Sequence, residues 1–169
     1  TVENSGSTDN DYGVVALNLY GTEGTSYTLS SSKLPVYNGK YWSALVQRTT
    51  EGGSLLSSDD SGSAIKYNLY VGQYNEEAHK VLHSSYTSMI VSGANATEQK
   101  GNASWTSPMT MYIGGGLGKR YGHMFTGSLQ EYRTWNGEIL TKDTFLNHVA
   151  SPKTYTGNTY SSSNEYNTV

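Results

Sequence analysis

The stretch AIKYNLYVGQY, residues Ala64–Tyr74, places an apolar or aromatic side chain at every second position over most of its length. Alternation with a period of two puts those side chains on one face of an extended chain, which is the pattern of a half-buried strand. Its apolar positions are mostly β-branched or aromatic residues, which favour strands. We therefore predict a strand over this stretch, with Leu69 and Val71 in the core.

The same signals recur on both sides of this stretch, separated by turns rich in Gly, Asn, Asp and Ser. Further strands are predicted over Gly13–Tyr20, Ser26–Ser30, Tyr41–Thr49, Lys80–Ser92, Met109–Gly114 and Gly122–Trp135. Only the segment that begins at Thr141 favours helix, for two turns at most, because Pro152 prevents its continuation. The predicted fold is all-β, an antiparallel β-sandwich (jelly roll) with one short C-terminal helix. Residues expected in its core are Trp42, Leu45, Leu69, Val71, Ile113 and Leu129.

Length and composition set the class of protein. A chain of 169 residues suits one domain with a real core, and its 15 tyrosines suit half-wet faces and contact surfaces. The net charge of −3 argues against nucleic acid or an anionic membrane as partner, and no apolar run is long enough for membrane insertion. The absence of cysteine excludes disulfides and thiolate metal sites.

The ends, residues 1–11 and 151–169, are linker-like, so we expect the folded module over 12–150, cut from a longer chain.

Motifs in the second half of the chain resemble the concanavalin A-like family, specifically its laminin-G-like and pentraxin-like branch. In that branch a strand ending in "iGg" precedes an F-x-G-x-hydrophobic-x-E-x-R-x-aromatic-N strand and a short helix. The matching residues are Ile113–Gly115, then Phe125, Gly127, Leu129, Glu131, Arg133, Trp135 and Asn136, then Leu140–His148. Upstream, NGKYWSALVQR (Asn38–Arg48) and YNLYVGQY (Tyr67–Tyr74) resemble two further strands in the expected order. Gly72 departs from the pattern, because no hairpin Asn or Asp precedes it.

Glu131, Arg133 and Trp135 fall on one face of the last predicted strand at a spacing of two. The carboxylate and the guanidinium are therefore expected to pair beside the indole. Because no second acid lies nearby, an ion pair that orients the strand is a better interpretation than a catalytic carboxylate.

The other candidate catalytic, phosphate-binding and metal-binding motifs in the sequence are incomplete. Glycosidases on this fold need two carboxylates about 5–5.5 Å apart, and no suitable E-x-D-x-x-E strand occurs. GGGLGKR (Gly114–Arg120) lacks the spacing of a phosphate-binding loop. His79 and His83 would lie roughly 13 Å apart on a strand, too far for one metal ion. We therefore predict that the protein is not an enzyme.

Calcium is the metal that the resemblance implies, since many members of the family hold it in a loop. DNDYG (Asp9–Gly13) and SSDDSGS (Ser57–Ser63) supply the hard oxygen ligands that Ca²⁺ prefers. Short Asx-rich turns also cap themselves without metal, so both interpretations stay open. If a site exists, we expect Asp59 or Asp60 in it.

The remaining pattern favours a non-catalytic binding or adhesion module that recognises glycan or a partner protein surface. Sugar rings stack on aromatic side chains, and the loop-placed aromatics expected to bind are Tyr12, Tyr74, Trp105 and Tyr121. The alternative is a purely structural or decoration module of a virion or another large extracellular assembly, with neighbouring modules as partners. FLNHVASPKTYTGNT (Phe145–Thr159) supports it, because it resembles the end of laminin-G-like modules in long phage virion proteins. Either function implies an extracellular or virion location.

Overall fold

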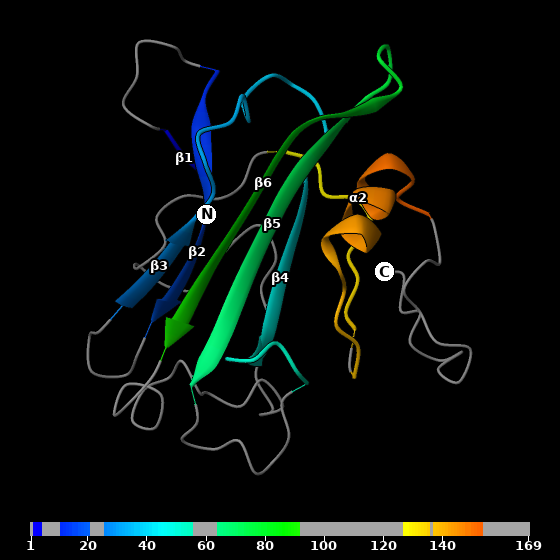
Figure 1. Cartoon of the computed structure of the whole chain (residues 1–169). Helices are drawn as coiled ribbons and strands as arrows, with labels where there is room; N and C mark the ends of the chain where they lie inside the picture. Colours follow the sequence, from blue (N-terminus) through cyan, green and yellow to red (C-terminus); the bar gives the residue numbers. More distant parts are fainter. Residues whose placement is uncertain are drawn as a thin grey trace.

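A computed structural model describes residues 2–4, 11–20, 26–55, 64–91, 127–135 and 137–153. These residues form mostly β structure with one short helix (Figure 1). The elements are β1 (Val2–Asn4), β2 (Gly13–Tyr20), β3 (Ser26–Ser30), β4 (Ser43–Thr50), β5 (Ile65–Asn75), β6 (Lys80–Val91) and α2 (Lys142–Ala150). Strand β1 lies within the segment that the sequence suggested to be a linker.

The strands form two antiparallel sheets, ordered β1-β2-β3 and β4-β5-β6. Five of the predicted strands are confirmed, each within about two residues of the expected ends. Strand β5 is the centre of the larger sheet, with Leu69 opposite Val46 on β4 and opposite Thr87 on β6. A β-bulge between Gln73 and Tyr74 shifts the register near the β5–β6 turn. The predicted strand Met109–Gly114 lies outside the described residues.

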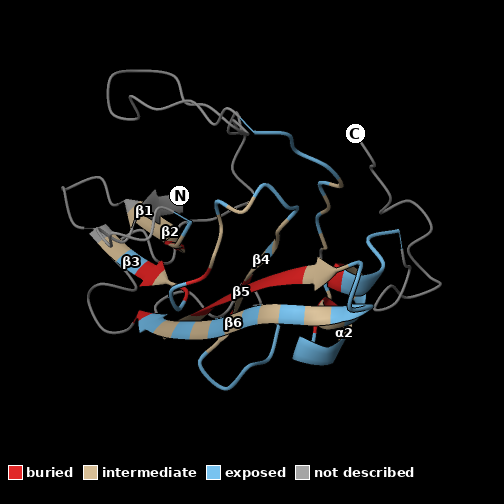
Figure 2. Cartoon of the chain, turned by 90° about the horizontal axis from the view of Figure 1, so that it is seen from above, coloured by how far each residue is buried: buried red, intermediate tan, exposed pale blue. Residues whose placement is uncertain are grey.

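The two sheets face each other across a shared apolar core (Figure 2). One face of β5 supplies the fully buried side chains Ile65, Tyr67 and Val71, which alternate along the strand as predicted. Leu29 of β3 and side chains of β2 pack against them from the smaller sheet. The buried members of this core are Leu29, Leu34, Ile65, Tyr67, Leu69, Val71 and Val91. The prediction that Leu69 and Val71 are buried is therefore confirmed.

Helix α2 covers the opposite face of β5. Phe145 and Val149 of the helix form a second buried cluster with Tyr70, whose ring centroid lies 5.6 Å from that of Phe145. The Thr141 side chain caps the helix by accepting a hydrogen bond from the Thr144 amide, at the position where the sequence predicts that the helix begins. The helix has 9 residues, about two and a half turns, which is slightly longer than expected. It ends before Pro152.

Residues 127–135 are not a strand, so the predicted strand over Gly122–Trp135 is wrong for its described part. Glu131 has a φ of 57°, in the left-handed region, which turns the backbone out of an extended path. Leu129, which was predicted to be buried, is 62% exposed. Trp42 and Leu45 are half-buried rather than fully buried, and Ile113 lies outside the described residues.

Candidate functional site

Two loops are joined at the end of the molecule where β2 begins. Gly13 and Leu34 exchange backbone hydrogen bonds in both directions at 2.9 Å. One step further out, the Tyr37 amide donates to the Asp11 carbonyl oxygen at 3.0 Å. Backbone bonds of this kind fix the relative position of two loops more firmly than side-chain contacts alone, because they leave few free dihedrals. Residues 11–12 and 33–42 therefore form one surface.

The second of these loops turns sharply before β4. The Asn38 amide donates to the Pro35 carbonyl oxygen at 3.3 Å, and Gly39 follows with a φ of 70° that favours glycine. The Asn38 side chain then organises the rest of the turn. Its Oδ1 accepts from the Lys40 amide at 3.1 Å and from Trp42 Nε1 at 3.2 Å. One side-chain oxygen thus holds both the backbone after the turn and the indole that follows it.

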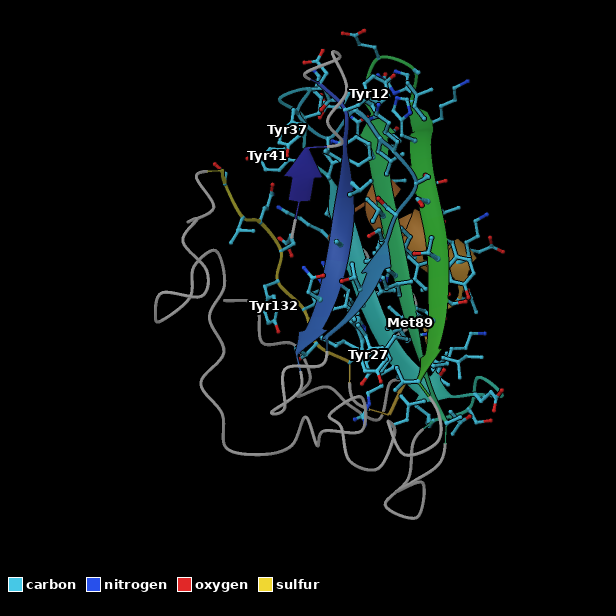
Figure 3. The ribbon with its side chains drawn as sticks, turned by 90° about the vertical axis from the view of Figure 1, so that its left-hand side faces the viewer. Tyr12, Tyr27, Tyr37, Tyr41, Met89 and Tyr132 are labelled. Atoms are coloured by element: carbon cyan, nitrogen blue, oxygen red, sulfur yellow. The ribbon has the colours of Figure 1, made fainter. Side chains whose placement is uncertain are left out.

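The joined loops carry a concentration of aromatic side chains, which we call the aromatic rim and define as Tyr12, Tyr37, Tyr41 and Trp42. Tyr37 is 44% exposed and Tyr41 is 66% exposed, although tyrosine rings carry a large apolar area. Figure 3 shows Tyr12, Tyr37 and Tyr41 at the same end of the molecule, with Tyr27 and Met89 toward the other.

Polar and charged groups frame the aromatic rim. Lys33 Nζ lies 5.9 Å from the centroid of the Tyr12 ring, within the range of a cation–π contact. The Trp42 ring stacks on His83 of β6, with ring centroids 6.1 Å apart and an interplanar angle of 29°. Lys33 and Lys40 are exposed beside the tyrosines. The rim therefore combines apolar ring faces with hydrogen-bond donors, on a backbone that hydrogen bonds hold in place.

The structure brings only part of the predicted site together. Tyr12 lies in the aromatic rim, whereas Tyr74 packs beside Tyr70 and helix α2 and is not part of it. The predicted ligand-binding residues Trp105 and Tyr121 and the predicted calcium ligands Asp59 and Asp60 lie outside the described residues. Within the described part of the chain, no group of three or more His, Asp or Glu side chains is placed to hold a metal ion.

The sequence reasoning missed Tyr37 and Tyr41. Their signal was the composition of KLPVYNGKYW (Lys33–Trp42), a turn marked by Pro and Gly that also carries three aromatic residues. Tyr41 was placed inside a strand, but β4 begins at Ser43, so Tyr41 stays in the loop. An aromatic-rich turn next to a strand start would have identified both residues.

The predicted pair of Glu131 and Arg133 is confirmed, at 3.2 Å between carboxylate and guanidinium, but it lies in a loop and not on a strand. Arg133 Nη1 lies 3.2 Å from His148 Nδ1 on α2, and Nη2 also donates to the Pro152 carbonyl oxygen. Because an arginine only donates, Nδ1 of His148 is the acceptor. The Trp135 and His148 rings meet in a T-shaped arrangement, with centroids 5.5 Å apart. These contacts attach the 127–135 segment to the end of helix α2.

Among the residues that the structure describes, no helix is long and apolar enough to span a membrane. Comparisons with protein-family models, with curated proteins and with solved structures find no match.

Proposed function

We propose that this protein is a non-catalytic glycan-binding module of an extracellular or virion protein, with its ligand held at the aromatic rim. The proposal includes the finer fold expected from the sequence, a jelly roll of the laminin-G-like type. The two facing antiparallel sheets and the short C-terminal helix support that expectation.

One observation carries the proposal, namely the exposure of two tyrosine rings on loops that backbone hydrogen bonds join. Tyr41 at 66% and Tyr37 at 44% leave apolar area in water, and the bond from Tyr37 to Asp11 holds their loop beside Tyr12. The exposed part of these rings contributes no burial energy to the fold. Fixed, exposed aromatic side chains are typical of surfaces that bind.

A sugar ring matches this chemistry better than a purely apolar ligand does. Its C–H faces stack on tyrosine rings, while its hydroxyl groups need donors and acceptors at the edge. Lys33, Lys40 and the loop backbone offer such groups around the rim. Loops that a rigid sheet positions are also where recognition residues concentrate, because they vary without disturbing the core.

The test is a glycan array followed by titration of the best ligand, with the wild-type chain and the double variant Tyr37→Ala/Tyr41→Ala. Loss of two stacking contacts is expected to weaken binding by a factor of about 5 to 150, since each contributes about 0.5–1.5 kcal/mol. Tyr132→Ala is the matched control, because Tyr132 is 38% exposed but belongs to another segment. It should bind as the wild type does.

Each outcome has a distinct meaning. Binding that the double variant loses and the control keeps supports the proposal. Binding that all three chains share moves the ligand away from the aromatic rim and contradicts the proposed site. A wild-type chain that binds no glycan contradicts the function and favours the structural module.

A further inference from the structure

Within the part of the chain that the structure describes, strand β6 forms one edge of its sheet, and its exposed face carries an apolar side chain at every fourth position. Among the described residues no strand pairs with it on the side away from β5. Leu82, Tyr86 and Ile90 are 44%, 45% and 47% exposed, at a spacing of four residues. No Lys, Arg, Asp or Glu occurs between Val81 and Val91. Natural sheets usually protect a long margin with charges, proline or a covering segment, so an uncharged one favours pairing with another strand.

The sequence of β6 reads nearly the same in both directions about Tyr86. From that residue outward, each pair of positions holds side chains of the same type or of similar size. The pairs are Ser85 with Thr87, Ser84 with Ser88, His83 with Met89, Leu82 with Ile90, and Val81 with Val91. In an antiparallel pair of identical strands related by a two-fold axis, residue i lies opposite residue j and j lies opposite i. A strand with this symmetry of sequence is complementary to its own copy.

The central residue of this pattern is held in place on its own sheet. Tyr86 lies directly opposite Tyr70 of β5, and their ring centroids are 4.7 Å apart. Its hydroxyl donates to Oδ1 of the buried Asn68 at 3.1 Å. The ring therefore loses little conformational freedom when a second ring packs beside it.

We propose that β6 pairs antiparallel with β6 of a second copy of this chain, with the two-fold axis at Tyr86. The two larger sheets then join into one sheet of six described strands. Tyr86 packs against its own copy, Ser84 lies opposite Ser88 of the second chain, and Leu82 lies opposite Ile90. No like charges meet, because the strand carries none over this range. The proposal does not depend on the glycan-binding function, since the aromatic rim belongs to other residues.

The first test uses the register in which the two-fold axis at Tyr86 places Ser84 opposite Ser88 of the second chain. An interface of two paired strands is small, so we expect weak association. The mass of the wild-type chain is therefore measured by sedimentation up to about 100 µM, where a dimer is expected. Ser84→Lys/Ser88→Lys puts lysines opposite lysines and should weaken dimerisation roughly tenfold or more. Ser84→Lys/Ser88→Glu puts lysine opposite glutamate in both pairs and should retain the dimer. Within one chain these two positions face the neutral Gly72 and Asn68, so both variants are expected to fold alike.

The second test uses cross-linking, for which the absence of native cysteine is an advantage. Tyr86→Cys places two thiols next to the axis, and mild oxidation with diamide should give a covalent dimer. Ser84→Cys is the control, because the axis separates its two copies by about 13 Å. A wild-type chain that is monomeric up to 100 µM by the first test, or equal cross-linking of the two cysteine variants, would overturn the proposal. Circular dichroism of each variant verifies that it is folded.

Discussion

Gly72 on β5 lies directly beneath Val149 of helix α2. A Cβ placed on Gly72 would come within 3.1 Å of Val149 Cγ2 and 3.3 Å of Phe145 Cε1. The absence of a side chain at this one position lets the helix approach the sheet closely enough to bury Phe145 and Val149. The sequence alone made Gly72 look like a misplaced hairpin glycine, but its role is the contact between sheet and helix.

Gly72→Ala is therefore expected to lower the free energy of unfolding by about 1–3 kcal/mol, through overpacking against the helix. Urea unfolding measures this change. Gly52→Ala is the matched control, because a Cβ there meets no atom within 4 Å, and it should leave stability nearly unchanged. Adding Val149→Ala to Gly72→Ala removes the closest of these contacts, so the double variant should lose less free energy of unfolding than the sum of the two single variants. If the losses in free energy of unfolding simply add, Gly72 and Val149 do not limit how closely the helix packs on the sheet.

Substitutions of Arg133 and Glu131 are expected to lower the free energy of unfolding by different amounts, although the two residues form one ion pair. Glu131→Gln should cost about 1 kcal/mol, because the pair is largely buried but the amide oxygen of Gln still accepts from the guanidinium. Arg133→Gln should cost about 2 kcal/mol, since it also removes the contacts to His148 and Pro152. Equilibrium unfolding of both variants measures the difference.

Amide hydrogen exchange separates a local effect from a global one. Loss of Arg133 should speed exchange most in the last turn of α2, near Ser151, whose amide donates to the Asn147 carbonyl oxygen. Equal costs for the two substitutions, or exchange that rises uniformly, would contradict an anchoring role for Arg133.

Alkaline pH should destabilise the protein through its core tyrosines. Burial raises the pKa of Tyr70 above 10.0, and the neighbouring Tyr86 raises it further. Burial also raises the pKa of Tyr67, and the nearby Arg48 guanidinium offsets this only in part. Because the folded state disfavours the tyrosinate, its stability is complete below the ordinary pKa and decreases as the pH rises through the folded value. Urea unfolding between about pH 9 and 11 should show this decrease.

Tyr70→Phe provides the control for that dependence. It removes one titrating hydroxyl from the core, so its stability should fall less steeply with pH than that of the wild type. Identical slopes would mean that Tyr70 does not contribute to the alkaline loss.

The contrast between β5 and the 127–135 segment explains what sequence could predict. The alternation in Ala64–Tyr74 indicates one buried face, and the observed strand follows it because a sheet imposes the same period of two. Glu131, Arg133 and Trp135 also alternate, but Arg133 is held by partners on α2 and at Pro152, and Glu131 takes a left-handed φ. Those partners are far away in sequence, so no local pattern could indicate them. Tyr37 and Tyr41 depend in the same way on the bond from Tyr37 to Asp11.

Calcium binding stays a prediction that a melting curve can test. A cation bound to the folded state alone raises stability in proportion to RT ln(1 + [Ca²⁺]/Kd). If Asp59 or Asp60 binds it, the melting temperature should rise between EDTA and millimolar Ca²⁺. Asp59→Asn/Asp60→Asn should abolish that shift, whereas Asp143→Asn on α2 should not. A melting temperature unmoved by Ca²⁺ would exclude the site.

Asn38 is expected to act as a positioning residue for the aromatic rim. Asn38→Ala removes the oxygen that accepts from Trp42 Nε1 and from the Lys40 amide, so the rings remain but their arrangement loosens. Glycan affinity should fall severalfold, while Asn38→Asp, which keeps the acceptor, should retain binding of neutral glycans. The chain has 3 tryptophans, so the indole N–H signal of Trp42 can be followed by NMR without ligand.

In Asn38→Ala that signal should shift and exchange faster with water, because the hydrogen bond that protects it is gone. In Asn38→Asp it should stay protected. Glycan affinity and the Trp42 indole signal together show whether the arrangement of the aromatic rim depends on Asn38. If glycan affinity falls in Asn38→Ala while the Trp42 indole signal is unchanged, Asn38 contacts the ligand itself. If the indole signal moves while affinity holds, the ligand does not depend on the geometry of this turn, and the proposed site loses its structural support.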